Sequence, residues 1–66
     1  MNSFRLARIR AGLTLAELSA KAGVSPDAIS TAERGIRDPQ ATTVHRLARA
    51  LNVDPADLLA PERVAS

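Results

Sequence analysis

The chain has 66 residues with a formal net charge of +2, no cysteine and a single histidine, His45. This length allows one small domain that buries only about 60% of the surface of its unfolded chain. The missing cysteines exclude disulfides and cysteine-ligated zinc, and we expect no metal and no other cofactor. The longest apolar runs are far too short to span a membrane and no basic segment precedes a hydrophobic one, so we expect a cytoplasmic protein with no membrane partner.

A first helix is predicted to begin at Asn2 or Ser3, either of which can cap it, and to end at Gly12. Residues at helical spacing form its inward stripe, which consists of Phe4, Ala7, Arg8 and Ala11. Arg8 is a charge on an apolar stripe, so it needs a partner if it is buried. A second apolar stripe is formed by Leu6 and Ile9. This stripe packs either against the C-terminal helix or against another subunit.

Two short helices joined by a tight turn are predicted next. Thr14 and Glu17 form a capping box, in which the Thr14 hydroxyl accepts from the N–H of residue 17 and the carboxylate accepts in return, so a helix begins directly after Thr14. Gly23 ends this helix, because glycine adopts the left-handed conformation at little cost. Ser25 caps the following helix, and Pro26 takes its first position, where a missing N–H costs nothing.

Apolar and small residues fall where two crossed helices would meet, at Leu18, Ser19, Ala22, Val24, Ile29 and Ala32. This spacing is typical of a helix-turn-helix, whose second helix enters the major groove of DNA. The segment LTLAELSAKAGVSPDAISTAERGIRDP resembles the Cro/cI-type (XRE) helix-turn-helix family, and the resemblance covers about residues 4 to 60. It implies a lambda-repressor-like domain, and the helix start signals along the chain predict five helices and an all-α fold over residues 1–60, with a C-terminal tail at residues 61–66. It also implies a structural salt bridge between Arg8 and Glu33.

Two further helices are predicted after the helix-turn-helix. Gly35 opens a loop, and the Asp-Pro pair at residues 38–39 closes it by capping a fourth helix. The inward face of that helix consists of Ala41, Val44, Leu47, Ala48 and Leu51. Asn52 can end the fourth helix in the left-handed conformation, and a second Asp-Pro pair at residues 54–55 starts a short fifth helix. This last helix contains Leu58 and Leu59.

The distribution of charge favours a nucleic-acid partner over catalysis. Residues 1–50 carry eight basic and four acidic side chains, whereas residues 51–66 carry one basic and three acidic side chains. The basic excess therefore belongs to the helix-turn-helix and its flanks, as DNA binding requires, although a solvated arginine-rich surface would look similar. An enzyme is not expected, because His45 stands alone, most carboxylates have a role at helix starts, and no phosphate loop or nucleophile motif is present.

The resemblance places the candidate base contacts on the third helix, at Pro26, Asp27, Ala28, Ser30 and Thr31. These are short side chains and one acid, where bidentate base contacts need a long side chain such as Gln or Arg. Asp27 could accept a hydrogen bond from cytosine or repel phosphates. The candidate phosphate contacts are Arg10, the backbone N–H of Leu15, Lys21, Ser25, Arg34 and Arg37. Specificity is expected to depend also on DNA shape or on residues outside the third helix.

A homodimer is expected, because one recognition helix reads only half of a two-fold symmetric operator. The predicted dimer contacts are Val53, Leu58, Leu59 and Val64, at the acidic, apolar C-terminal end. In the alternative, Leu58 and Leu59 only close the core against the first helix. We expect a nucleoid-associated transcriptional regulator that represses by binding double-stranded DNA. The rival interpretation is a protein-interaction module, such as an antitoxin or anti-repressor, that binds DNA weakly and a regulatory protein well.

Overall fold

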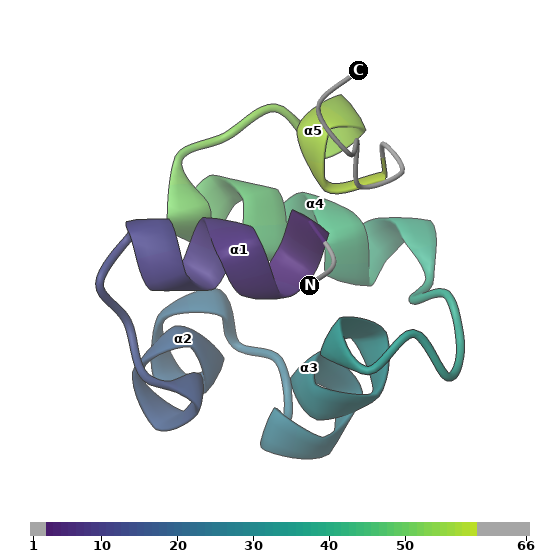
Figure 1. Cartoon of the computed structure of the whole chain (residues 1–66), viewed down its shortest axis with the longest axis horizontal. Helices are drawn as coiled ribbons and strands as arrows, with labels where there is room; N and C mark the ends of the chain where they lie inside the picture. Colours follow the sequence, from purple (N-terminus) through teal and green to yellow (C-terminus); the bar gives the residue numbers. More distant parts are fainter. Residues whose placement is uncertain (1–2, 60–66) are drawn as a thin grey trace.

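The computed structural model describes residues 3–59, and within them the chain forms five α-helices and no strand. The helices are α1 (Ser3–Arg10), α2 (Leu15–Ala22), α3 (Pro26–Glu33), α4 (Ala41–Leu51) and α5 (Pro55–Leu59). In Figure 1, α2 and α3 lie on one side of α1 and α4, and α5 lies on the other. The predicted all-α fold is confirmed over this range. The possible cap Asn2, the dimer contact Val64 and the tail at residues 61–66 fall outside the described residues.

No helix within residues 3–59 has the length and apolar character needed to cross a membrane.

The helix ends around the turn form as predicted. The hydroxyl of Thr14 accepts from the N–H of Glu17 at 3.1 Å, and the Glu17 carboxylate accepts from the N–H of Thr14 at 2.8 Å. Gly23 follows α2 with φ 68°, in the left-handed region. The hydroxyl of Ser25 accepts from the N–H of Ala28 at 3.2 Å, and a proline takes the first position of α3. Local sequence signals therefore determine both ends of the turn.

The capping box makes stability depend on pH. The hydrogen bond from the Thr14 backbone N–H lowers the pKa of Glu17 below its ordinary value of 4.5. A carboxyl with a lowered folded-state pKa contributes stability above its unfolded-state pKa, and this contribution is lost as the pH falls through the folded-state value. We therefore expect the parent to melt at a higher temperature than Glu17→Gln at neutral pH, and the two melting temperatures to converge in acid. Circular dichroism melts from about pH 7 to about pH 3 measure the gap. A gap that stays constant over this range would contradict the assignment.

The core lies where α2, α3 and α4 meet and extends under α5. Its buried residues are Leu18, Val24, Ile29, Ala32, Val44, Leu47, Ala48, Ala50, Leu51 and Leu58. Leu18, Ile29 and Leu47 are the largest of those that are almost completely buried. At the crossing of α2 and α3, the Ser19 hydroxyl donates to the carbonyl oxygen of Val24 at 2.6 Å. The crossing predicted from residue spacing is therefore confirmed.

Three predictions at helix boundaries are wrong. Ala11 is exposed, because α1 ends at Arg10 and the next residue already belongs to the turn. Ala41 is exposed, because it is the first residue of α4 and lies at the edge of the loop. The Asp-Pro pair at residues 38–39 does not cap α4. Gln40 holds the N-cap position instead, which leaves Asp38 two residues before the cap.

α5 packs against α1 and α4. Asn52 ends α4 with φ 57°, and the Asp54 carboxylate accepts from the N–H of Ala56 at 2.9 Å at the start of α5, both as predicted. Leu58 is 2% exposed and belongs to the core, whereas Leu59 is 61% exposed. Leu58 therefore closes the core, as in the second alternative, and is not available as a dimer contact.

Candidate nucleic-acid interface

α3 presents the exposed Asp27 and the half-buried Thr31 on its outward face, and the exposed Arg34 follows the helix as its C-cap residue. Asp27 and Thr31 are four residues apart, so they lie above one another on the helix. The opposite face is buried through Ile29 and Ala32, which are 1% and 3% exposed. Because these two apolar side chains are held in the core, the orientation of the polar face is determined by packing.

The remaining candidate base contacts on α3 differ in how far they reach solvent. Pro26 is exposed at the start of the helix, and Ser30 is half-buried. Ala28 is half-buried and packs against the core, so only part of its methyl group can contact a thymine methyl. The α3 surface is therefore polar at its centre and offers only short side chains.

The first turns of α2 and α3 carry the groups predicted to meet phosphates. Leu15 is the first residue of α2, and its side chain packs against the core. Because a leucine side chain has no polar atom, its backbone N–H is its only donor. The Ser25 oxygen accepts the capping bond of α3, while its hydroxyl hydrogen can still be donated to a phosphate oxygen. Both groups lie where the helix dipole favours an anion.

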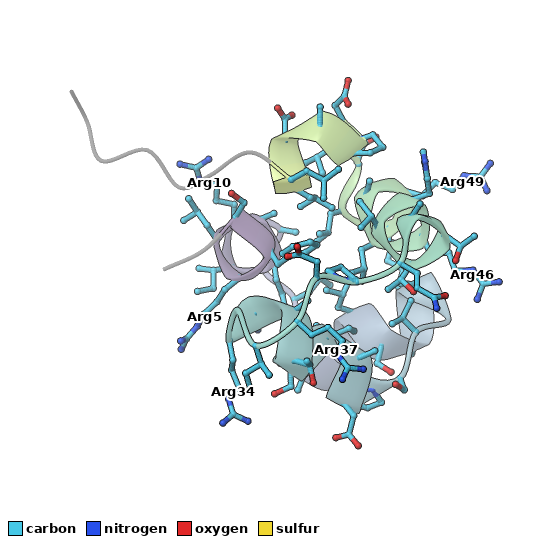
Figure 2. All side chains as sticks on the ribbon, turned by 90° about the vertical axis from the view of Figure 1, so that its right-hand side faces the viewer. Arg5, Arg10, Arg34, Arg37, Arg46 and Arg49 are labelled. Atoms are coloured by element: carbon cyan, nitrogen blue, oxygen red, sulfur yellow. The ribbon has the colours of Figure 1, made fainter. Side chains whose placement is uncertain are left out.

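Figure 2 separates the predicted phosphate contacts into two groups. Arg34 projects from the end of α3, and Arg37 projects beside α3 from the loop that leads to α4. Arg10 projects from α1 on the side of α5, away from α3, so the structure does not bring it to the same surface. Arg5, which was not among the predicted contacts, projects from α1 on the side of Arg34 (Figure 2). Lys21 is exposed in the last turn of α2, where its charge complements the helix dipole.

An ion pair joins α1 to the end of α3. The Arg8 guanidinium donates to the Glu33 carboxylate twice, from Nε to Oε2 at 2.6 Å and from Nη2 to Oε1 at 3.0 Å. Its Nη1 also donates to the carbonyl oxygen of Leu13 at 3.0 Å. The hydrogen bonds to Glu33 raise the pKa of Arg8 above its ordinary value. The predicted salt bridge is therefore present, with side chains only 16% and 8% exposed, and it anchors the C-terminal end of α3.

A groove of about 380 Å³ lies between α3, the following loop and the start of α4. It is lined by Asp27, Ala28, Thr31, Arg37, Asp38, Pro39, Gln40 and Thr43. Within residues 3–59, Arg37 forms no ion pair with Asp27 or Asp38, so its charge is available to a ligand. Gln40, the N-cap residue of α4, and Thr43 in its first turn were not among the predicted contacts, and they place polar groups beside the outward face of α3.

A second group of basic residues lies on α4. Arg46 and Arg49 project from the side of α4 that faces away from α1 (Figure 2). The Arg46 Nη1 donates to the carbonyl oxygen of Gly23 in the α2–α3 turn, over a long 3.4 Å. In contrast, α5 and the turn before it carry Asp54 and Asp57. Basic side chains therefore project from α1, from α4 and from the segment after α3, whereas α5 and the turn before it carry no basic residue among residues 54–59.

Known proteins are similar to this chain over the same segment. A family model described as Helix-turn-helix (HTH_3) matches residues 4–58. The "Uncharacterized HTH-type transcriptional regulator y4dJ" of Sinorhizobium fredii (strain NBRC 101917 / NGR234) is 38% identical over 60 residues, which cover 91% of this chain and 78% of that protein. These matches confirm the resemblance inferred from the capping box, the turn and the crossing residues, and they include every element of the candidate interface.

Proposed function

The chain belongs to the helix-turn-helix family, whose matched relative is named as a transcriptional regulator, and from this premise we propose that it is a sequence-specific repressor that binds double-stranded DNA through α3. The observation that carries the proposal is the outward face of α3. Asp27 and Thr31 lie on it, and Arg34, at the end of the helix, and Arg37, beside it, add positive charge. Such a regulator works at the nucleoid, in the cytoplasm.

Base contacts and phosphate contacts are made by different residues of this surface. Pro26, Asp27 and Thr31 occupy the part of α3 that would meet base edges in the major groove, with Ala28 and Ser30 at its flanks. The phosphates are bound by two arginines and by two donors at helix starts, namely Arg34, Arg37, Ser25 and the backbone N–H of Leu15. No step of this function needs a metal, a cofactor or a catalytic group.

Selection from a random duplex pool, followed by gel shifts at increasing salt, tests the proposal. We expect one enriched motif made of two inverted half-sites about 10 base pairs apart, because a symmetric dimer places two recognition helices one DNA turn apart. Affinity should fall linearly with salt on a logarithmic scale. The short side chains and the acid on α3 favour a second candidate, a module that binds a regulatory protein, such as an antitoxin or anti-repressor. A pool without any enriched motif would support that candidate.

We also propose that the regulator is a homodimer formed through α5. Leu59 is 61% exposed there, and Ile9, on the neighbouring α1, is 47% exposed. Val53 is half-buried and adds a smaller apolar surface. Burying such side chains between two copies is favourable because it removes apolar area from water.

Leu59→Glu is expected to weaken self-association by about tenfold or more, because it places a charge in the proposed interface. Sedimentation equilibrium measures the effect. Ile36→Glu is the matched control, since Ile36 is 63% exposed but lies in the α3–α4 loop, remote from α5 (Figure 1). This control should self-associate like the parent. A parent that remains a monomer at tens of micromolar concentration, or a control that dissociates as readily as Leu59→Glu, would rule out α5 as the interface.

A further inference from the structure

We propose that Gln40 is a specificity-determining residue, which reads an adenine in the major groove next to the base pair that Thr31 contacts. The inference rests on the proposed DNA-binding function and extends it to α4. Three observations support it: an uncommitted side-chain amide, a groove shared with α3, and the shortness of the candidate base contacts on α3 itself.

The amide of Gln40 has no structural task among residues 3–59. Gln40 holds the N-cap position of α4, yet its side chain makes no capping hydrogen bond. The caps of α2 and α3 behave differently, because Thr14 and Ser25 both accept a backbone N–H through their side-chain oxygens. Glutamine is not among the residues favoured at an N-cap, since its longer side chain does not place an acceptor over the first turn. The helix start therefore does not explain this residue, and its exposed amide can bind a ligand.

The groove places Gln40 beside the outward face of α3. Gln40 and Thr43 form one wall and Asp27, Ala28 and Thr31 form the other, around the same space of about 380 Å³. The backbone of Gln40 is held in place, because its carbonyl oxygen accepts from the N–H of Val44 at 3.0 Å. Val44 is itself 3% exposed in the core. A base pair that contacts Thr31 would therefore lie next to Gln40, whose backbone is fixed at the start of α4.

The chemistry of the groove favours a base over a phosphate. Two carboxylates, Asp27 and Asp38, line the groove and repel anions. Arg37, which also lines it, already provides a cation for the phosphate backbone of the DNA. A neutral amide adds little to phosphate binding in such surroundings. Its NH2 group can donate to N7 of adenine while its carbonyl oxygen accepts from the N6 amino group, which is a bidentate match in the major groove. Gln40 thus provides the bidentate group that is missing from the short side chains of α3.

The test compares the parent with Gln40→Ser on the operator selected by the parent. Serine is a good N-cap and shortens the side chain, so the variant keeps its fold, which thermal melts verify. Affinities for every single-base-pair variant of the operator should show that Gln40→Ser loses about tenfold to a hundredfold of discrimination at one A·T pair per half-site. Preferences elsewhere and the salt dependence should be unchanged. Replacing that adenine with 7-deazaadenine, which lacks N7, should weaken the parent and leave Gln40→Ser unaffected.

Two results would overturn the assignment while leaving the DNA-binding function intact. One is a Gln40→Ser variant that keeps every base preference of the parent. The other is a variant that weakens on all sequences alike with a shallower salt slope, which is the behaviour of a phosphate contact. A parent that enriches no motif at all would overturn the proposed function, and this inference with it.

Discussion

Replacing Arg8 with alanine is expected to destabilise the fold by about 3 to 5 kcal/mol, because it leaves the Glu33 carboxylate at 8% exposure without its ionic partner. The same substitution removes the hydrogen bond to the carbonyl oxygen of Leu13. Domains of this size have a total stability of only about 5 to 10 kcal/mol, so the variant should be close to unfolding. Its melting temperature should fall by more than about 10 °C.

Urea or thermal unfolding of Arg8→Ala, Glu33→Ala and the double variant measures this prediction. The double variant should lose less than the sum of the two single losses, because it leaves no unpaired charge. A single Arg8→Ala variant that melts within a degree or two of the parent would mean that the ion pair does not hold α3 in place. DNA binding should decrease in parallel with stability, since the end of α3 leads directly into the loop that carries Arg37.

The second large effect concerns Thr31 and Arg37, whose variants should fail in different ways. Thr31 lies on the outward face of α3, so Thr31→Ala should change the preference at one or two base pairs by about 1 to 3 kcal/mol and leave non-specific affinity nearly unchanged. Arg37 projects from the loop, so Arg37→Ala should weaken binding to every sequence alike. It should also flatten the slope of log affinity against log salt by about one unit.

Asp27→Ala is an informative control for this pair. If Asp27 repels phosphates, its removal should tighten binding to all DNA, whereas the loss of a cytosine contact should relax only one position of the operator. Fluorescence anisotropy on the operator and on shuffled DNA, at several salt concentrations, separates these outcomes. Identical sequence profiles and salt slopes for Thr31→Ala and Arg37→Ala would remove the distinction between base and phosphate contacts on this surface.

The structure follows the sequence most closely where a residue acts on its immediate neighbours. The capping box at Thr14 and the left-handed Gly23 and Asn52 involve atoms only a few residues apart, so short motifs specify them. Ala11 and Ala41 were placed on buried stripes because helical spacing alone does not show where a helix ends. Each lies within one residue of a helix boundary, where the chain turns away from the core.

Tertiary packing determines which side chains of α5 and α1 are buried and which are exposed, and residue spacing alone does not predict this. Leu58 and Leu59 are adjacent on a helix of five residues, and only the position of α5 against α1 and α4 shows that the first of them is buried. The position of Arg5 on the side of Arg34 also follows from tertiary packing and was not predicted. A usable signal was available, since the predicted pairing of Arg8 with Glu33 brings α1 to the end of α3, and Arg5 lies one turn before Arg8.

Gln40 was overlooked for a different reason. The Asp-Pro pair before it reads as a complete helix start, so the sequence offered no role for the next residue. In the structure α4 begins after Gln40, the amide makes no capping hydrogen bond within residues 3–59, and the residue lines the groove. Binding residues that lie outside the recognition helix depend on how the loop is placed, and no motif in this chain encodes that placement.

The specificity ratio of the purified protein tests the central claim most directly. It is the affinity for the operator selected from a random pool, divided by the affinity for a shuffled duplex of the same length, both measured at physiological salt. A regulator that reads bases through α3 should bind its operator at least about a thousandfold more tightly. A ratio near one, with an affinity that still falls as salt increases, would show that the protein binds phosphates without reading the sequence. This result would contradict sequence-specific binding through α3.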